Sequence, residues 1–226
     1  MYIIILGFPH CGTSILKSII GHCESVKEIL YETDKITKDD RNNEYKYHLC
    51  KTPYSKEKYF GEEYQKFHKI MILRNPIYVY SSLNKRFSNN IPQRLSFRHY
   101  LKALSLYDKI SKTDHNDTSL LLYKNLFLNN FQAIKNVLNA IGIKYNNEIF
   151  DNSKYDNFIS KKFMNLKQIK SQPNPKQHDK YRTYQINLPF VNMNDPAKIN
   201  LTNTQKSVIL EDALVNQYFP ENQNII

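Results

Sequence analysis

Short aliphatic runs recur along the chain and are separated by segments in which apolar residues follow a helical period. The runs are Tyr2–Leu6, Tyr47–Cys50, Lys69–Leu73 and Ser119–Tyr123. Continuous apolar runs of this length are typical of strands that are buried on both faces of a sheet. We therefore predict four core strands at these positions.

Apolar residues at helical spacing predict helices over Thr13–His22, Pro76–Phe87, Phe97–Ile110 and Phe127–Ile141. Gly142 follows the last of them, and glycine is a natural helix C-cap because it adopts the left-handed conformation without strain. Strands that alternate with helices favour an α/β fold, in which helices flank a parallel sheet in three layers.

Residues 151–200 differ from the rest of the chain, because they are polar, contain several prolines and show few apolar periods. A long irregular segment of this kind is a functional lid, part of an acceptor site or a poorly ordered stretch. No internal repeat and no low-complexity linker divides the sequence. We therefore expect one domain over residues 1–226.

A closing helix is predicted over Thr202–Phe219. Thr202 and Gln205 have the spacing of a capping box at its start. The side chains expected to face the core are Leu210, Leu214 and Tyr218.

The chain of 226 residues carries a formal net charge of +11. Its basic residues are spread out and accompanied by no nucleic-acid motif, so we expect a field that gathers anionic ligands rather than a nucleic-acid partner. No apolar run reaches the roughly 18 residues of a membrane span. The apolar start lacks the basic flank of a secretory signal, which favours a cytoplasmic location. Three cysteines without metal-ligand spacing predict reduced thiols and no metal site.

The loop after the first strand, Gly7–Ser14, is close to a nucleotide-binding P-loop. That motif has Gly, four residues, Gly, Lys, then Ser or Thr; here Gly7 and Gly12 keep the spacing, but Thr13 replaces the lysine. The helix that follows directs free N–H groups and its positive dipole end at an anion, and Thr13 and Ser14 add hydroxyls. A phosphate cradle without the lysine favours a phosphate ligand other than ATP or GTP.

Polar side chains also follow the other predicted strands, at Lys51, Arg74 and Tyr123. In an open parallel sheet, ligands bind outside the carboxyl ends of the strands, so we expect these groups to surround one crevice with the loop. Ser82 lies eight residues after Arg74, in the helix that begins at Pro76. Arg74 and Ser82 could share one phosphate, because the planar guanidinium grips phosphate oxygens.

These motifs, in their order and spacing, resemble the signatures of sulfotransferases that use 3′-phosphoadenosine 5′-phosphosulfate (PAPS). The first signature wraps the 5′-phosphosulfate, and it is matched by Pro9, His10, Cys11, Gly12, Thr13 and Ser14. The second holds the 3′-phosphate, and Arg74, Asn75 and Pro76 with Ser82 are similar to it. The resemblance covers roughly residues 1–145 and implies a P-loop NTPase-like sulfotransferase fold.

Three looser similarities add to the expected site. The segment that starts at Tyr123 looks like a third signature, which would place Tyr123 beside the adenine. The segment Lys51–Pro53 resembles one whose lysine faces the sulfonate. Members of the family often close the site with a basic loop, so the resemblance suggests Lys180 and Arg182 as further contacts of the 3′-phosphate, with a solvated charge cluster as the alternative.

The sequence departs from the family pattern at two positions. His10 stands where many members have Lys or Arg, which neutralises charge on the leaving phosphate. With a pKa near 6.5, histidine is only partly charged at neutral pH, although an adjacent anion would favour its protonated form. Lys17 or Lys51 could share this work. Pro53 stands where cytosolic members have a histidine base.

Another branch of the family uses a glutamate shortly after the first helix as its base, and Glu32 lies in a similar context. Glu32 is therefore the expected base, with Glu28 and His48 as the next candidates and a solvated glutamate as the alternative role for Glu32.

The resemblance implies transfer of a sulfonate group from PAPS to a hydroxyl or amine of a small-molecule or glycan acceptor, with adenosine 3′,5′-bisphosphate (PAP) as product. Glu32, His10 and Lys51 are the expected catalytic residues, and no metal is required. Two alternatives stay open: a catalytically impaired nucleotide-binding module of the same fold, and a degenerate P-loop kinase. The sequence leaves the acceptor and the oligomeric state undetermined.

Overall fold

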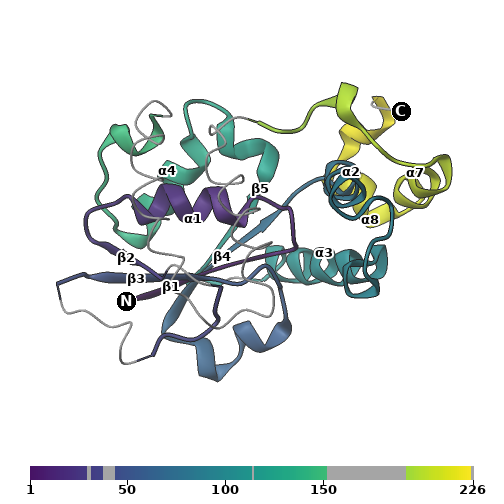
Figure 1. The fold of residues 1–226 in the computed structure, drawn as a ribbon. Helices are drawn as coiled ribbons and strands as arrows, with labels where there is room; N and C mark the ends of the chain where they lie inside the picture. The colour runs from purple at the N-terminus through teal and green to yellow at the C-terminus, as the bar shows by residue number, and fades with distance from the viewer. Residues whose placement is uncertain (30–31, 38–43, 114, 152–191, 225–226) are drawn as a thin grey trace.

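The computed structural model describes residues 1–29, 32–37, 44–113, 115–151 and 192–224. Within these residues, five strands form one parallel sheet in the order β2-β3-β1-β4-β5 (Figure 1). The strands are β1 (Tyr2–Gly7), β2 (Val26–Glu28), β3 (Tyr47–Lys51), β4 (Phe67–Leu73) and β5 (Thr118–Leu122). The four predicted strands are confirmed, with ends that differ by one or two residues. The short edge strand β2 was not predicted, because three residues carry no recognisable apolar run.

The register of the sheet brings the predicted polar groups to one edge. Ile5 of β1 pairs with Lys51 at the end of β3. Leu73 of β4 pairs with Leu122 of β5, so Arg74 and Tyr123 leave the sheet side by side. Because all the strands are parallel, the loop after β1 emerges at this same edge.

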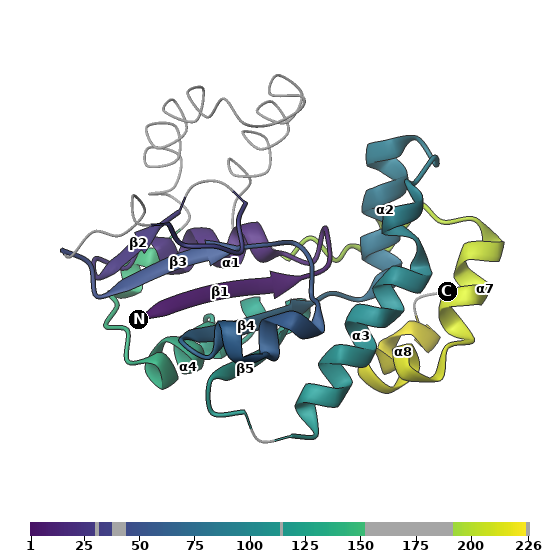
Figure 2. The same ribbon diagram turned by 90° about the horizontal axis from the view of Figure 1, so that it is seen from below.

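Helices cover both faces of the sheet. On one face, α1 (Thr13–Gly21) and α4 (Gln132–Ile141) bury apolar side chains against β1 and β4 in a single cluster. On the other face, α2 (Pro76–Phe87) and α3 (Phe97–Ser111) pack against the alternate residues of the same strands. This alternation follows from the two-residue side-chain period of a strand, and it confirms the predicted three-layer α/β fold. Figures 1 and 2 show α2 and α3 grouped toward the carboxyl ends of the strands.

Helix α4 begins later than predicted, at Gln132 rather than at Phe127. Tyr123–Phe127 forms a 3₁₀ helix, and the three residues before α4 have positive φ angles, namely Asn129, Asn130 and Phe131. Asparagine tolerates the left-handed conformation better than most residues, so the pair of asparagines allows the chain to turn before the helix. The predicted C-cap is confirmed, since Gly142 has a φ of +78°.

The predicted closing helix is divided into α7 (Asn203–Leu210) and α8 (Ala213–Tyr218). The Asp212 side chain accepts a hydrogen bond from the Val215 N–H and starts a new helix there. The break changes the helical phase, so the deeply buried side chains are Ile209, Val215 and Phe219 instead of the predicted ones, of which Leu214 and Tyr218 are only half-buried. The predicted capping box of α7 is confirmed.

Short 3₁₀ helices complete the described structure at Glu57–Phe60, Glu62–Tyr64, Gln93–Leu95, Tyr123–Phe127, Asn147–Phe150, Pro196–Lys198 and Pro220–Asn224. Among the described helices, none combines the length and the apolar character that a membrane crossing requires. Most of the irregular segment predicted at 151–200 falls outside the described residues.

Candidate functional site

A pocket of about 610 Å³ lies at the carboxyl edge of the sheet. Its wall contains His10 from the loop after β1, Lys51 from the end of β3, Arg74 after β4 and Tyr123 after β5. The polar groups that the sequence places at four strand ends therefore line one pocket. Its volume lies in the range of small-molecule sites, which is roughly 300–1,000 Å³.

The loop between β1 and α1 depends on Gly12. Gly12 is the N-cap of α1 and has a φ of +92°, a conformation that glycine adopts without strain. A Cβ atom built on Gly12 would lie only 2.5 Å from Cδ2 of Tyr123. The glycine is thus required both by the turn of the backbone and by the tyrosine ring packed against it.

The N-terminus of α1 faces the pocket through Thr13, Ser14 and Ile15. The first N–H groups of a helix have no acceptor within the helix, and the helix dipole places partial positive charge there. The N-cap residue, Gly12, has no side chain that could cap this end of α1. Backbone, dipole and two hydroxyl groups together favour an anion at this position.

Lys51 connects the loop to the predicted base. Its ammonium group donates to Ser14 Oγ at 2.8 Å and to Glu32 Oε1 at 2.9 Å. Lys51 is only 5% exposed, so its charge acts in a largely dehydrated environment. The Thr33 N–H donates to the Lys51 carbonyl, which holds the segment of Glu32 along β3. A cation, a hydroxyl and a carboxylate therefore meet beside the N-terminus of α1.

Arg74 forms the opposite wall of the pocket. Its guanidinium lies 4.6 Å from the centre of the Tyr123 ring and donates to the His10 carbonyl at 3.3 Å. It also donates to Asn194 Oδ1 at 2.7 Å and to the Met193 carbonyl at 2.9 Å. These contacts fix a buried arginine with its face on an aromatic ring. Met193 and Asn194 were not predicted, since nothing in a polar stretch signals a contact so distant along the chain.

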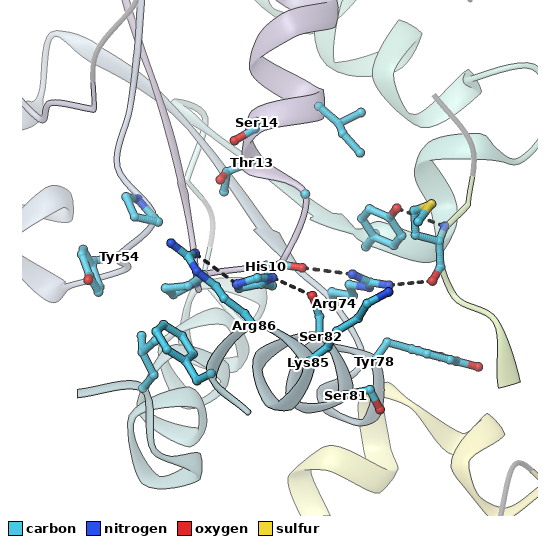
Figure 3. Close-up of a pocket in the computed structure, with 18 of the residues that line it drawn as sticks. His10, Thr13, Ser14, Tyr54, Arg74, Tyr78, Ser81, Ser82, Lys85 and Arg86 are labelled. Atoms are coloured by element: carbon cyan, nitrogen blue, oxygen red, sulfur yellow. Dashed lines mark hydrogen bonds between the residues drawn. The ribbon is translucent and has the colours of Figure 1, made fainter. Parts of the chain in front are cut away.

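His10 lies in the middle of the pocket, between Ser82 and Arg86 (Figure 3). Its Nδ1 is 2.7 Å from Ser82 Oγ, and its Nε2 is 3.4 Å from an Arg86 nitrogen. Because a guanidinium only donates, Nε2 accepts, and Nδ1 carries the proton that it donates to Ser82. The second phosphate motif thus contacts the first one through a side-chain hydrogen bond.

The protonation of His10 differs from the sequence expectation. Burial first, and then the positive charges of Arg86 and Arg74, lower the pKa of His10 to about 3. His10 is therefore neutral at pH 7 in this structure rather than partly charged. An anion placed between these groups would raise the pKa of His10 again.

This lowered pKa predicts a pH-dependent stability. Between about pH 6.5 and pH 3 the unfolded chain binds a proton at His10 that the folded protein does not, so the free energy of unfolding falls as the pH drops through this window. We expect a loss of about 1 to 2 kcal/mol between pH 7 and pH 5 from this group. In His10→Asn this part of the pH-dependent loss of stability should disappear, which urea unfolding at pH 7 and pH 5 measures. Asparagine suits the position because His10 has a positive φ of 68°.

The matched control for this measurement is His99→Asn, at an exposed position on α3 outside the pocket. Equal changes of the pH slope in the two variants would show that His10 is not its source. A slope that His10→Asn leaves unchanged would contradict a lowered pKa at His10.

The pocket is strongly positive. Of the residues that the structure describes, six basic ones line it, against two acidic ones. The basic residues are Lys51, Arg74, Lys85, Arg86, Arg94 and Lys198, and the acidic ones are Glu32 and Asp195. Four of these cations, Lys85, Arg86, Arg94 and Lys198, were not predicted from the sequence. Helical spacing was the available signal for two of them, since Lys85 and Arg86 follow Ser82 by one turn of α2.

Several candidates from the sequence do not line the pocket. Cys11 is buried in the core, where desolvation raises the pKa of its thiol to about 12, and its N–H donates to the Phe8 carbonyl. Lys17 pairs with Glu28 at 3.2 Å, and both side chains are nearly buried. Cys11, Lys17 and Glu28 are thus part of the packing around the loop rather than of the pocket wall.

Three further candidates also fall elsewhere. His48 lies within β3 and packs against the ring of Tyr2, away from the pocket wall. Lys180 and Arg182 lie outside the described residues. The remaining site residues of the prediction line the pocket, namely Pro9, His10, Gly12, Thr13, Ser14, Glu32, Lys51, Arg74, Ser82 and Tyr123. Over the described ranges, no group of three or more His, Cys, Asp or Glu side chains could hold a metal ion.

Comparison with known proteins relates the chain to one group of solved structures. Mouse sulfotransferase SULT7A1 complexed with PAP is 16% identical, with a TM-score of 0.54 over 99% of this chain and 87% of that one. The sulfotransferase domain of the Synechococcus PCC 7002 olefin synthase is 13% identical, with a TM-score of 0.54 over 99% of this chain and 93% of that one. No protein-family model matches the sequence, and no curated protein matches it either.

Both structures are similar over almost the whole chain, and the similarity extends to a five-stranded parallel sheet flanked by helices. The chain therefore has the sulfotransferase fold.

Proposed function

We propose that the protein is a sulfotransferase, which moves a sulfonate group from PAPS to an acceptor hydroxyl or amine. The observation that carries the proposal is the cluster of Lys51, Ser14 and Glu32 at the N-terminus of α1. It combines an anion-binding helix end with a buried cation and a carboxylate that can accept a proton. The fold of the chain and the binding of PAP by mouse SULT7A1 support the same donor.

The pocket has suitable groups for both phosphate ends of the nucleotide. The N-terminus of α1, with Thr13 and Ser14, would hold the 5′-phosphosulfate. Arg74 and Ser82 would hold the 3′-phosphate, and both already contact the loop through His10. Tyr123, beneath the Arg74 guanidinium, offers an aromatic wall for the adenine. The excess of basic residues matches the charge of such a ligand.

PAPS supplies the sulfonate, which forms a new bond to the acceptor oxygen while the bond between sulfur and the bridging phosphate oxygen breaks. Glu32 accepts the proton of the acceptor hydroxyl. Lys51 and the N–H groups of α1 stabilise the charge that grows on the departing phosphate. Without a ligand, His10 is neutral and donates its Nδ1 proton to Ser82; a phosphate bound beside it would raise the pKa of His10 and favour the imidazolium, whose Nε2–H can donate to that phosphate. The residues act chiefly by positioning and by electrostatics.

Transfer of ³⁵S from labelled PAPS to a panel of hydroxyl acceptors, combined with calorimetric titration of PAP, tests the proposal. Binding and transfer together support it. Binding of PAP without transfer would favour the impaired nucleotide-binding module instead. Preferential binding of ATP with Mg²⁺ would favour the kinase.

Glu32→Gln should lower kcat for sulfonate transfer by about 10²-fold or more, because general base catalysis contributes on that scale. The affinity for PAP should stay within about threefold of the wild type, since the amide keeps the size of the side chain. Glu63→Gln is the matched control, at an exposed position outside the pocket. Equal losses in both variants, or none in Glu32→Gln, would exclude Glu32 as the base.

A further inference from the structure

The pocket has two sides, separated by His10. Figure 3 shows Tyr54 and Arg86 on one side of His10, and Arg74, Tyr78 and Lys85 on the other. The side with Arg74 is the proposed site of the 3′-phosphate. The opposite side, with Tyr54 and Arg86, is not used by the nucleotide in this proposal.

We call this second side the acceptor lobe and define it by Pro53, Tyr54, Arg86, Phe87, Arg94 and Leu95, all of which line the pocket. Pro53 and Tyr54 come directly after the end of β3, two and three residues beyond Lys51. The other four come from the C-terminal end of α2 and the 3₁₀ helix after it. Since a helix rises about 1.5 Å per residue, Phe87 lies roughly 16 Å along α2 from Pro76, far from Arg74.

The lobe adjoins the proposed chemistry. Lys51, which holds the Glu32 carboxylate at 2.9 Å, immediately precedes the segment that supplies Pro53 and Tyr54. A group bound in the lobe would therefore lie next to the carboxylate that accepts a proton. This is where an acceptor must present its hydroxyl.

The basic residues of the lobe favour acceptors that carry a negative charge. Arg86 and Arg94 both line it and are both exposed to solvent at its rim. Among the described residues of the pocket wall, the two acidic ones, Glu32 and Asp195, are paired with Lys51 and Lys198. Arg86 and Arg94 bring two guanidinium groups to the lobe, and the guanidinium fork suits carboxylate, sulfate or phosphate groups.

The lobe also has flat apolar surfaces. Tyr54 is 37% exposed, and Phe87 is half-buried; both line the pocket. Aromatic side chains of this kind pack well against the face of another ring. Pro53 and the buried Leu95 extend the apolar surface.

We propose that the acceptor is a hydroxylated ring compound that carries an anionic group, with Arg86 and Arg94 binding the anion and Tyr54 and Phe87 packing against the ring. This inference rests on the proposed function for the identity of the lobe as an acceptor site. It adds the chemical class of the acceptor, which the fold does not provide.

Matched acids and esters test the inference on the full chain saturated with PAP. The probes are 4-hydroxyphenylacetate and glucuronate, each compared with its own methyl ester by calorimetric titration. We expect each acid to bind at least tenfold more tightly than its ester. Arg94→Gln should weaken the acids about tenfold and leave the esters unchanged, whereas Tyr54→Ala should weaken acid and ester alike.

Arg98→Gln is the matched control, since this exposed arginine lies four residues further along, on α3, and outside the pocket. Esters that bind as tightly as the acids, or equal effects of Arg94→Gln and Arg98→Gln, would overturn the inference. The same titrations without PAP separate it from the proposed function. If the acids bind in a manner that depends on Arg94 but the protein binds no PAP and transfers no sulfonate, the anion site is supported and the proposed sulfotransferase activity is refuted.

Discussion

Lys51→Met should lower kcat/KM for sulfonate transfer by about 10³-fold, the upper part of the range seen when a group that stabilises transition-state charge is removed. The Lys51 ammonium is 5% exposed and contacts both Ser14 and Glu32 within 3 Å, so its charge acts at short range with little screening by water. Methionine keeps the length of the side chain and removes the charge. We expect PAP to bind about tenfold more weakly, because the product carries the same phosphate.

Lys56→Met is the matched control, because Lys56 is exposed and lies outside the pocket, five residues after Lys51. Circular dichroism and thermal unfolding should show that both variants fold. A second check uses Glu32→Gln in the Lys51→Met background. Because the two side chains contact each other, the free-energy cost of the double variant, measured from kcat, should be smaller than the sum of the costs of the two single variants. Transfer within tenfold of the wild type in Lys51→Met would refute the role of the cation.

The sequence predicted those parts of the site whose signals are local. The aliphatic runs define the central strands, because β1, β3 and β4 are buried on both faces over almost their whole length. Ligands bind at the carboxyl ends of parallel strands, and this rule predicts that Lys51, Arg74 and Tyr123 lie around one crevice. The register of β4 with β5 confirms that the last two residues leave the sheet side by side.

Other parts of the site depend on contacts that leave no local pattern. The Arg74 guanidinium bonds Asn194, which is 120 residues further along the chain and lies in a stretch without apolar periodicity. The neutral state of His10 depends on burial and on two arginines, neither of which is adjacent to it in sequence. A motif specifies which residue stands at a position, but the pKa of that residue is set by the groups that the fold places around it.

The resemblance to sulfotransferases indicated Glu32 as the base, although the sequence alone could not separate it from Glu28. The structure distinguishes their surroundings: Glu28 pairs with Lys17 in a nearly buried contact, and Glu32 lines the pocket. Two backbone hydrogen bonds to β3 accompany this difference: the Ile29 N–H, next to Glu28, donates to the Leu49 carbonyl, and the Thr33 N–H, next to Glu32, donates to the Lys51 carbonyl. These contacts leave no local signal, because β2 has only three residues and Lys51, which holds Glu32, lies 19 residues further along the chain.

Gly12→Ala should abolish PAP binding, with a loss of affinity of 100-fold or more, and should also lower the free energy of unfolding by about 2 to 4 kcal/mol. The φ of +92° is strained for any residue with a Cβ, and that atom would lie 2.5 Å from Tyr123 Cδ2 and 2.8 Å from its Cε2. Tyr123 cannot move alone, because Arg74 stacks on its ring and its hydroxyl accepts the Met193 N–H. A methyl group at the N-cap of α1 therefore displaces the proposed 3′-phosphate contact as well as the phosphate cradle.

Gly61→Ala separates this effect from a general cost of adding a methyl group to a glycine. Gly61 has a φ of −88°, and the nearest contact of a new Cβ would be the Lys58 carbonyl at 3.4 Å, so alanine should be tolerated there without loss of PAP binding. The double variant with Tyr123→Ala is more informative. Removing the ring relieves the clash but not the backbone strain, so stability should return in part while PAP affinity stays low, because Arg74 has lost its aromatic support. Full PAP binding by Gly12→Ala, in a protein as stable as the wild type, would show that the ligand does not depend on this turn.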